Sequence, residues 1–167
     1  MILRVLALCG GLVGALTASQ VPEFSQQYKQ RLGGAVDALA EVVADFDASA
    51  QAEGLSREAA LAQMRGTSFL DRRRQDMTRT FRRFEQLQTD LARLDGAGPF
   101  MRAYVMAQSA DAEVAAAAFE TFEPAVPLNV AGGIFAGSGF IAGLLAVWAA
   151  LKLMLWPFGR RRAARGA

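Results

Sequence analysis

The sequence predicts an all-α protein in which two transmembrane helices flank an extracytoplasmic antiparallel helical hairpin or three-helix bundle. Two apolar stretches lie at the ends of the 167-residue chain, whereas every acidic residue lies between Glu23 and Glu123. The middle of the chain repeats its apolar residues every three or four positions, as amphipathic helices do. This length allows one domain, or one small domain with membrane anchors.

The C-terminal apolar stretch is typical of a membrane span. Val130 to Leu151 carry no charge and are followed by Lys152, Trp156 and the basic sequence GRRRAAR. About 22 residues, each rising about 1.5 Å along a helix, cross the roughly 30 Å hydrocarbon core of a bilayer. We therefore predict a C-terminal transmembrane helix over residues 128–158 and a basic cytoplasmic tail over residues 159–167.

The N-terminal stretch, residues 1–21, carries a single charged side chain, Arg4. It could be a cleaved signal peptide or a retained signal anchor. A cut after Ala18 would place the bulky Leu16 three residues back, which suits signal peptidase poorly. We therefore expect this stretch to be retained as an N-terminal transmembrane helix.

The distribution of charge predicts the orientation. The 16 acidic residues share the middle of the chain with twelve of the 18 basic ones, which leaves the middle at −4, while the six remaining basic residues flank the apolar ends. The cluster from Arg160 to Arg165 should stay cytoplasmic by the positive-inside rule. With two spans both termini are then cytoplasmic, and the helical domain over residues 22–127 faces the other side of the membrane, which is the periplasm if the organism is a Gram-negative bacterium.

Glycines recur at four-residue spacing in both apolar stretches. Such a spacing places small residues on one helix face, where two backbones can approach closely in a membrane. The alternative is that glycine is simply frequent in membrane helices. We expect these faces to pack against each other or against a partner: Gly10, Gly14, Gly133, Gly137, Gly139 and Gly143.

Three helices are expected in the middle region. The first starts near Phe24, after Pro22, which should separate it from the N-terminal span or kink the junction. Gly54 suits the left-handed position that ends a helix. The apolar face of this helix recurs at spacings of three and four: Phe24, Tyr28, Leu32, Val36, Leu39, Val43 and Phe46.

Capping residues predict where the remaining helices of the middle region begin. Ser56 can cap a short segment that extends to Met64, and Ser68 with Asp71 resembles a capping box for a long helix that ends near Leu94. Residues 95–99 contain two glycines and a proline, which break the chain. A third helix is then expected over residues 99–122, with Pro99 in its first turn.

A run of arginines lies on the second long helix. It could be a solvated face with weak surface ion pairs, or a surface for an acidic partner or anionic lipid head groups, since arginine binds phosphate in a bidentate way. Nucleic-acid binding is not expected for a region outside the cytoplasm. The candidate residues for anionic-lipid contact are Arg72, Arg73, Arg74, Arg79, Arg82 and Arg83.

No residue pattern in the chain indicates catalysis. There is no histidine, which removes the usual general base and the commonest zinc and haem ligand. The single cysteine, Cys9, is expected to pack in an apolar run. Asp45 with Asp47 could in principle bind a cation, but side chains two residues apart on a helix do not face each other. We predict no metal, no cofactor and no enzymatic activity.

The most distinctive sequence outside the apolar stretches is QQYKQRLGGAVDALAEVVADFDASA, residues 26–50. Two glycines within a helical pattern cost about 1 kcal/mol each relative to alanine, so a close helix contact is expected to require them. With an N-terminal span ending before VPEF and a glycine-rich C-terminal span, the chain resembles the bacterial DUF2937 family of inner-membrane proteins of unknown function. The resemblance implies a two-span membrane protein. The candidate contact residues are Tyr28, Gln30, Arg31, Leu32, Gly33 and Gly34.

These observations predict a membrane-anchored helical interaction module of unknown specific role. A domain of about 100 residues has little spare stability, which makes a protein partner or self-assembly plausible. The alternative is a lipid-binding or transport-accessory subunit of a larger inner-membrane complex.

Overall fold

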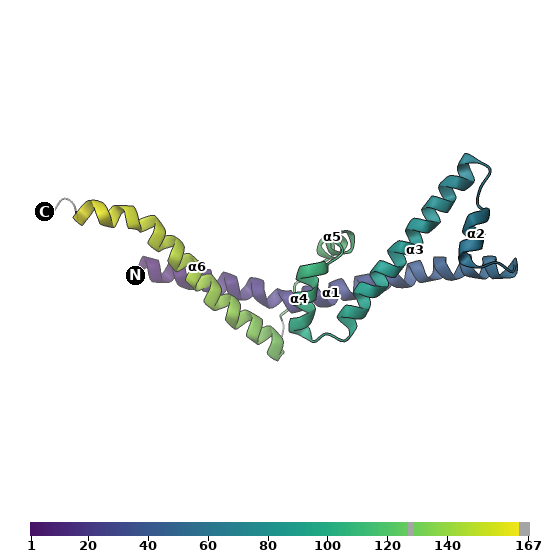
Figure 1. The fold of residues 1–167 in the computed structure, drawn as a ribbon. Coiled ribbons are helices and arrows are strands. Elements are labelled where there is room, and N and C mark those ends of the chain that lie inside the picture. Colours follow the sequence, from purple (N-terminus) through teal and green to yellow (C-terminus); the bar gives the residue numbers. More distant parts are fainter. Residues whose placement is uncertain (127–128, 164–167) are drawn as a thin grey trace. The chain divides into compact units, whose positions relative to one another are not determined.

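The structure is a computed structural model that describes residues 1–126 and 129–163, with side chains of the last helix described up to Met154. Within these residues the chain forms helices and no strands, so the all-α prediction is confirmed (Figure 1). The helices are α1 (Ile2–Ala52), α2 (Arg57–Gln63), α3 (Ser68–Asp95), α4 (Pro99–Ser109), α5 (Ala112–Glu120) and α6 (Val130–Ala163).

The chain forms two compact units. The first, called here the two-helix unit, combines Met1–Ser25 with the chain from Glu123 onward, and therefore holds the N-terminal part of α1 together with α6. The second, called the helical unit, comprises Gln26–Phe122, with the remainder of α1 and helices α2 to α5. The predicted tail, residues 159–167, lies outside the residues whose side chains are described.

Helix α1 runs without interruption through Pro22, so of the two predicted outcomes, a separation or a kink, the separation is wrong. A proline inside a helix removes one backbone hydrogen bond and costs about 3 kcal/mol or more. In a helix of 51 residues this loss does not end the helix. The Ser25 hydroxyl donates to the Pro22 carbonyl at 2.7 Å, and the Ser19 hydroxyl donates to the Leu16 carbonyl at 2.8 Å. Both hydroxyls thus bond back into α1 on either side of the proline.

The first two helix boundaries in the helical unit agree with the sequence. After α1, Gly54 adopts φ +67°, the left-handed conformation predicted for it, and the Leu55 N–H donates to the Ala50 carbonyl at 2.9 Å. Ser56 then caps α2, because its hydroxyl accepts a hydrogen bond from the Ala59 N–H at 3.2 Å.

The later boundaries differ from the prediction at two places. The cap of α3 is Thr67, whose hydroxyl accepts from the Leu70 N–H at 3.2 Å, and not Ser68, which is already helical. The expected single helix over residues 99–122 is divided into α4 and α5. Asp111 caps α5 by accepting a hydrogen bond from the Val114 N–H at 3.0 Å, so the chain starts a new helix there.

The helical unit has an apolar core between α1, α2 and α3. Phe81 of α3 lies at its centre, and the Phe46 and Phe81 rings meet edge to face with their centroids 5.1 Å apart. Around this pair lie Val43, Leu61, Met77 and Phe84. The α1 face predicted from periodicity is largely confirmed, since Tyr28, Leu32, Val36 and Val43 are all buried.

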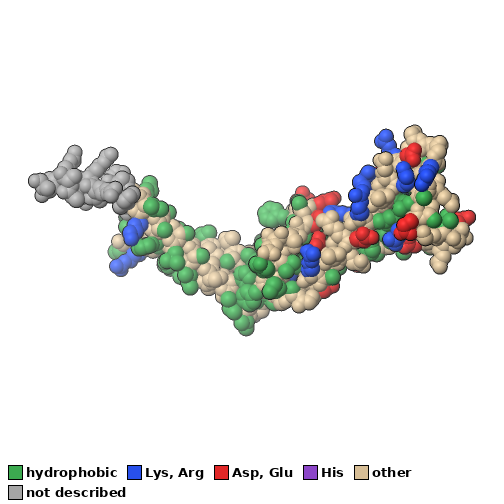
Figure 2. All heavy atoms as spheres, in the orientation of Figure 1, with side chains coloured by type: hydrophobic (Ala, Val, Ile, Leu, Met, Phe, Trp, Pro, Cys, Tyr) green, Lys and Arg blue, Asp and Glu red, His purple; other side chains and the backbone are tan. Residues whose placement is uncertain are grey.

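The two-helix unit carries its apolar side chains on the outside. Leu12, Val13 and Leu16 on α1 are each more than half exposed, as are Ile141 and Leu145 on α6. Figure 2 shows green hydrophobic side chains distributed along α6 and the N-terminal part of α1, whereas most charged side chains lie over the helical unit. A water-soluble domain has the opposite arrangement, with most of its large apolar side chains buried in a core.

Two helices are long and apolar enough to cross a membrane by their length and composition: α1 and the Val130–Met154 part of α6. Only 17% of the most apolar window in α1, and 6% of that in α6, is buried inside the structure. The core helix of a soluble protein would be mostly buried. Neither window is mostly buried in this structure.

Candidate functional site

Four of the predicted glycines form the crossing between α1 and α6 (Figure 1). A Cβ built on Gly14 would overlap the Gly139 carbonyl and come within 3.1 Å of the Gly143 Cα. A Cβ on Gly143 would likewise overlap the Gly10 carbonyl, and one on Gly139 would overlap the Gly14 carbonyl. The two backbones thus lie in direct contact, which only residues without a side chain permit.

The other two predicted glycines do not take part in this crossing. A Cβ built on Gly133 or Gly137 meets no atom within 4 Å in the described part of the chain. Sequence reasoning did not include Gly11, which faces the ring of Phe140, with 2.8 Å between a built Cβ and the ring edge. Four-residue spacing therefore selected positions both inside and outside this crossing, because it fixes a face of one helix and not the partner opposite.

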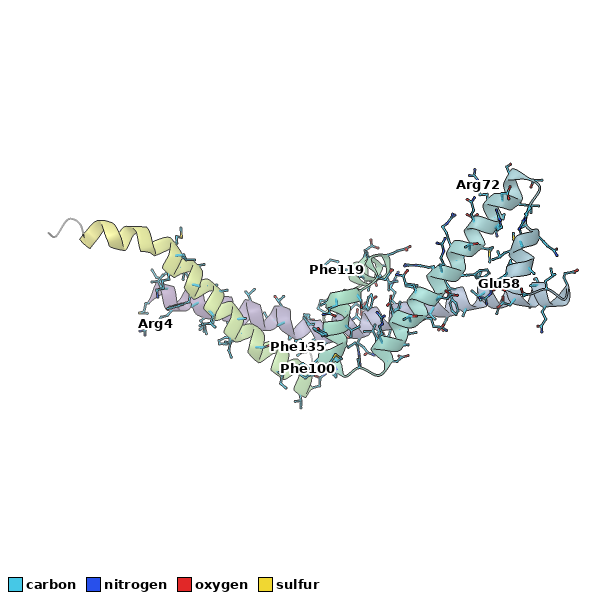
Figure 3. The ribbon with its side chains drawn as sticks, viewed as in Figure 1. Arg4, Glu58, Arg72, Phe100, Phe119 and Phe135 are labelled. Atoms are coloured by element: carbon cyan, nitrogen blue, oxygen red, sulfur yellow. The ribbon has the colours of Figure 1, made fainter. Side chains whose placement is uncertain are left out.

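An apolar pocket of about 840 Å³ lies beside the crossing, between the start of α1 and the C-terminal part of α6. Two cationic side chains, Arg4 and Lys152, lie among its mainly apolar walls, and Figure 3 labels Arg4 near the start of α1. The Lys152 ammonium lies over the Trp148 ring, 4.8 Å from its centroid, in a cation–π contact. The other residues that line the pocket include Leu3, Leu8, Leu144 and Leu151.

A polar site of the helical unit joins Arg83, Asp111 and Tyr28, and is called here the Arg83 clasp. Arg83 of α3 binds both carboxylate oxygens of Asp111, with 2.8 Å between Nη2 and Oδ1, and also binds Glu113 at 3.0 Å. The Asp111 N–H donates to the Tyr28 hydroxyl of α1 at 2.9 Å. One residue thus caps α5 and ties it to α1 and α3.

Burial and hydrogen bonding shift the pKa values of the clasp residues. The Asp111 side chain is 7% exposed, and hydrogen bonds from Arg83 lower the pKa of its carboxyl below the ordinary value. Burial raises the pKa of the Tyr28 hydroxyl, whose residue is 1% exposed. The charges are therefore fixed at neutral pH, and the clasp has the properties of a structural joint.

The predicted arginine face is largely occupied by its own acidic neighbours. Arg74 pairs with Asp71 at 3.5 Å. Asp76 pairs with Arg79 and also with Arg73, which lies 3.8 Å away. The structure thus assigns Arg83 to the clasp and leaves Arg72 and Arg82 as exposed members of the face. Figure 3 labels Arg72 near the start of α3.

The predicted contact cluster on α1 is divided between the core and the surface. Tyr28 and Leu32 are buried within the helical unit, so they are not on an outer surface. Gln30 is exposed, and Arg31, also exposed, donates to the Thr121 hydroxyl at 3.3 Å. No atom in the described residues lies within 4 Å of a Cβ built on Gly33 or Gly34. The close contact expected at this glycine pair is therefore not made inside the described chain.

Among the described residues, no group of three or more histidine, cysteine or acidic side chains could hold a metal ion.

A second polar joint, which the sequence analysis did not predict, is the pair between Arg57 and Asp47, with Nε and Oδ1 2.7 Å apart. The Arg57 guanidinium also lies over the Phe81 ring at 4.7 Å. The hydrogen bonds from Arg57 lower the pKa of the Asp47 carboxyl.

Comparison with family models gives a match over most of the chain. A family model described as "Protein of unknown function (DUF2937)" matches residues 2–160. No curated protein and no solved structure matches the chain. The match extends through both apolar helices and the whole helical unit.

Proposed function

The chain belongs to the DUF2937 family, as its sequence resemblance indicated, and from its architecture we propose that it is a membrane-anchored helical interaction module. In this proposal α1 and α6 anchor the protein in the bacterial inner membrane. The helical unit binds a protein partner or a second copy of itself and has no catalytic role.

The observation that carries this proposal is the glycine crossing with its outward-facing apolar side chains. In water, the exposed leucines, valines and isoleucines of α1 and α6 would lose the hydrophobic stabilisation that burial provides. In a bilayer they would contact acyl chains, and close backbone packing at small residues would hold the two helices together. The arrangement of small residues inside and apolar residues outside therefore favours lipid as the surrounding medium.

The charge distribution supports one orientation in this membrane. Arg4, Lys152 and the basic residues from Arg160 onward lie at one end of each apolar segment, while Glu23 and Glu123 lie at the other. The positive-inside rule then places both termini in the cytoplasm and the helical unit in the periplasm.

The glycine pair on α1 supports a role in contact with another protein. Gly33 and Gly34 each cost about 1 kcal/mol in a helix relative to alanine. No neighbour within 4 Å in the described chain accounts for this cost. Close approach of a helix from a partner or a second copy would account for it.

A topology measurement tests the membrane part of the proposal. Reporters that are active only in the periplasm or only in the cytoplasm are fused at Glu53 and after Ala167. We expect periplasmic activity at Glu53 and cytoplasmic activity after Ala167. A cytoplasmic signal at Glu53, or release of the protein by alkaline carbonate, would contradict it.

Crosslinking in intact membranes tests the interaction part. The double substitution Gly33→Leu with Gly34→Leu meets open space inside the chain, so the helical unit should still fold. We expect it to abolish a crosslinked product that the unmodified protein gives, while Ala48→Leu, at an exposed position of α1, retains that product. An unchanged product in the glycine variant would count against this surface.

A second candidate function, that of a lipid-binding or transport-accessory subunit, is favoured by a separate observation. The pocket between α1 and α6 combines apolar walls with Arg4 and Lys152.

A further inference from the structure

We propose that the pocket between the start of α1 and the C-terminal part of α6 binds an anionic phospholipid from the cytoplasmic leaflet. This inference rests on the proposed membrane anchoring and adds a specific ligand to it. The negatively charged headgroup would lie against Arg4 and Lys152. The acyl chains would lie along the leucine side chains of the pocket.

The shape and composition of the pocket fit this ligand. Its volume of about 840 Å³ lies within the range of about 300–1,000 Å³ for pockets that hold small molecules. Ala7, Leu8, Leu144 and Leu151 supply apolar surface from both helices. An elongated ligand with a long apolar portion can use this surface, whereas a free inorganic anion cannot.

The two cations at the pocket have no acidic partner among the residues that the structure describes. The first acidic residue of the chain is Glu23 and the last is Glu123, both at the opposite end of the apolar helices. At about 1.5 Å per residue, Glu23 lies about 28 Å along α1 from Arg4. Within the described residues, no acidic side chain pairs with Arg4 or Lys152 as Asp76 pairs with Arg79 on α3. An anionic headgroup would supply the missing negative charge.

Trp148 positions one of these cations. The Lys152 side chain reaches back along one turn of α6, and its ammonium is held over the Trp148 ring at 4.8 Å. Tryptophan is enriched at the level of lipid headgroups because its ring is apolar while its N–H is polar. The pair therefore places a positive charge at the depth where a headgroup phosphate lies, and basic pockets between membrane helices on the cytoplasmic side suit such headgroups.

Fluorescence quenching by brominated lipids tests this site in the full-length protein. The chain has two tryptophans, so Trp156→Phe leaves Trp148 in the pocket as the sole reporter. This variant is reconstituted in vesicles of phosphatidylcholine that contain brominated phosphatidylglycerol or brominated phosphatidylcholine. Bromine on the acyl chain quenches tryptophan fluorescence on contact. We expect an apparent binding constant about tenfold larger for the anionic lipid, because two cations face its headgroup.

Three variants separate a pocket from general surface charge. Arg4→Gln with Lys152→Gln should remove the preference, and Arg72→Gln on α3 should leave it intact. The charge-shift variant Arg4→Gln with Val5→Arg keeps the net charge but moves it to an exposed position that does not line the pocket. We expect it to lose most of the preference as well.

Each other result overturns the inference in a distinguishable way. Equal quenching by both lipids in the unmodified pocket would show membrane contact without a site for anionic lipid. An undiminished preference in the charge-shift variant would show surface electrostatics alone. Absence of quenching by either lipid, with release by alkaline carbonate, would instead overturn the membrane anchoring on which this inference rests.

Discussion

The two-helix unit and the helical unit use opposite means to hold helices together. At the crossing of α1 and α6, glycines let the two backbones touch directly at Gly14 and Gly139. In the helical unit, large side chains fill the contact around Phe81, and charged joints such as the Arg83 clasp connect its helices. Under the proposed membrane anchoring, this difference matches the two media, since apolar burial stabilises contacts in water and contributes little in lipid.

The largest effect is expected from filling the glycine crossing. Gly14→Leu would drive a side chain into the Gly139 carbonyl and the Gly143 Cα, where backbone cannot move aside. We expect α1 and α6 to separate. The free energy that holds them together should fall by about 3 kcal/mol or more, which is the upper end of the usual cost of overpacking. Detergent-induced unfolding in mixed micelles, followed by tryptophan fluorescence, measures this change.

Gly133→Leu is the matched control for that substitution. It places the same side chain on α6 at a position where a built Cβ meets no described atom within 4 Å. Its unfolding midpoint should stay close to that of the unmodified protein. Similar losses for both variants would mean that the crossing does not hold the two-helix unit together.

The next largest effect is expected at the Arg83 clasp. Arg83→Gln leaves the Asp111 carboxylate, 7% exposed, without its bidentate partner. We expect a loss of about 2–3 kcal/mol in the free energy of unfolding, typical of a buried hydrogen bond to a charged group. Urea unfolding of the full chain in micelles, followed by circular dichroism, reports the helical unit.

Arg79→Gln provides the comparison with a surface pair. Arg79 is largely exposed and pairs with Asp76 within one turn of α3. Its loss should cost at most about 0.5 kcal/mol. If both variants lost the same stability, the clasp would be no more than a surface ion pair.

A smaller effect is expected from the third member of the clasp. Tyr28→Phe removes the acceptor of the Asp111 N–H while it keeps the buried ring. The unpaired N–H should cost about 1–2 kcal/mol in the same urea experiment. Tyr104→Phe, which removes an exposed hydroxyl bonded to Gln108, should change stability little, and an equal loss in both would refute the assignment.

The smallest effect is expected from acid. The pKa of the Asp111 carboxyl is lowered by Arg83, and that of Asp47 by Arg57. A carboxyl with a lowered folded-state pKa stabilises the fold above its unfolded pKa, about 3.9, and loses this contribution as pH falls through the folded value. The free energy of unfolding should therefore stay level between about pH 5 and pH 7 and fall below about pH 4.

Arg83→Gln should make the decrease in acid shallower, because Asp111 would then titrate closer to its unfolded value. Unfolding curves of both proteins from pH 3 to pH 7 measure this difference. Parallel pH profiles would show that Asp111 does not contribute to the acid dependence.

Much of the fold could be predicted because it depends on local periodicity and local caps. The spacing of apolar residues on α1 identified Tyr28, Leu32 and Val43 as buried, and the position of Gly54 predicted the end of that helix. These signals operate within one or two helical turns. A single sequence contains them in full.

The errors and omissions arise where distant residues decide the structure. The division between α4 and α5 occurs at Asp111, whose partners Arg83 and Tyr28 lie 28 and 83 residues away in the sequence. The pocket depends in the same way on Arg4 and Lys152 facing one space from opposite ends of the chain. Helical spacing fixes which face a residue occupies but does not identify the residue across from it.

The glycine crossing has a consequence for the response of the protein to temperature. In a bilayer, the outward side chains of α1 and α6 contact acyl chains whether or not the backbones touch at Gly14 and Gly139. Separation of the two helices would expose little apolar surface to water, and such exposure is the source of the heat-capacity increase on unfolding. Opening of the crossing should therefore have a small heat-capacity change and a nearly linear dependence of stability on temperature. Unfolding of the core around Phe81 should show the strongly curved dependence of a water-soluble domain.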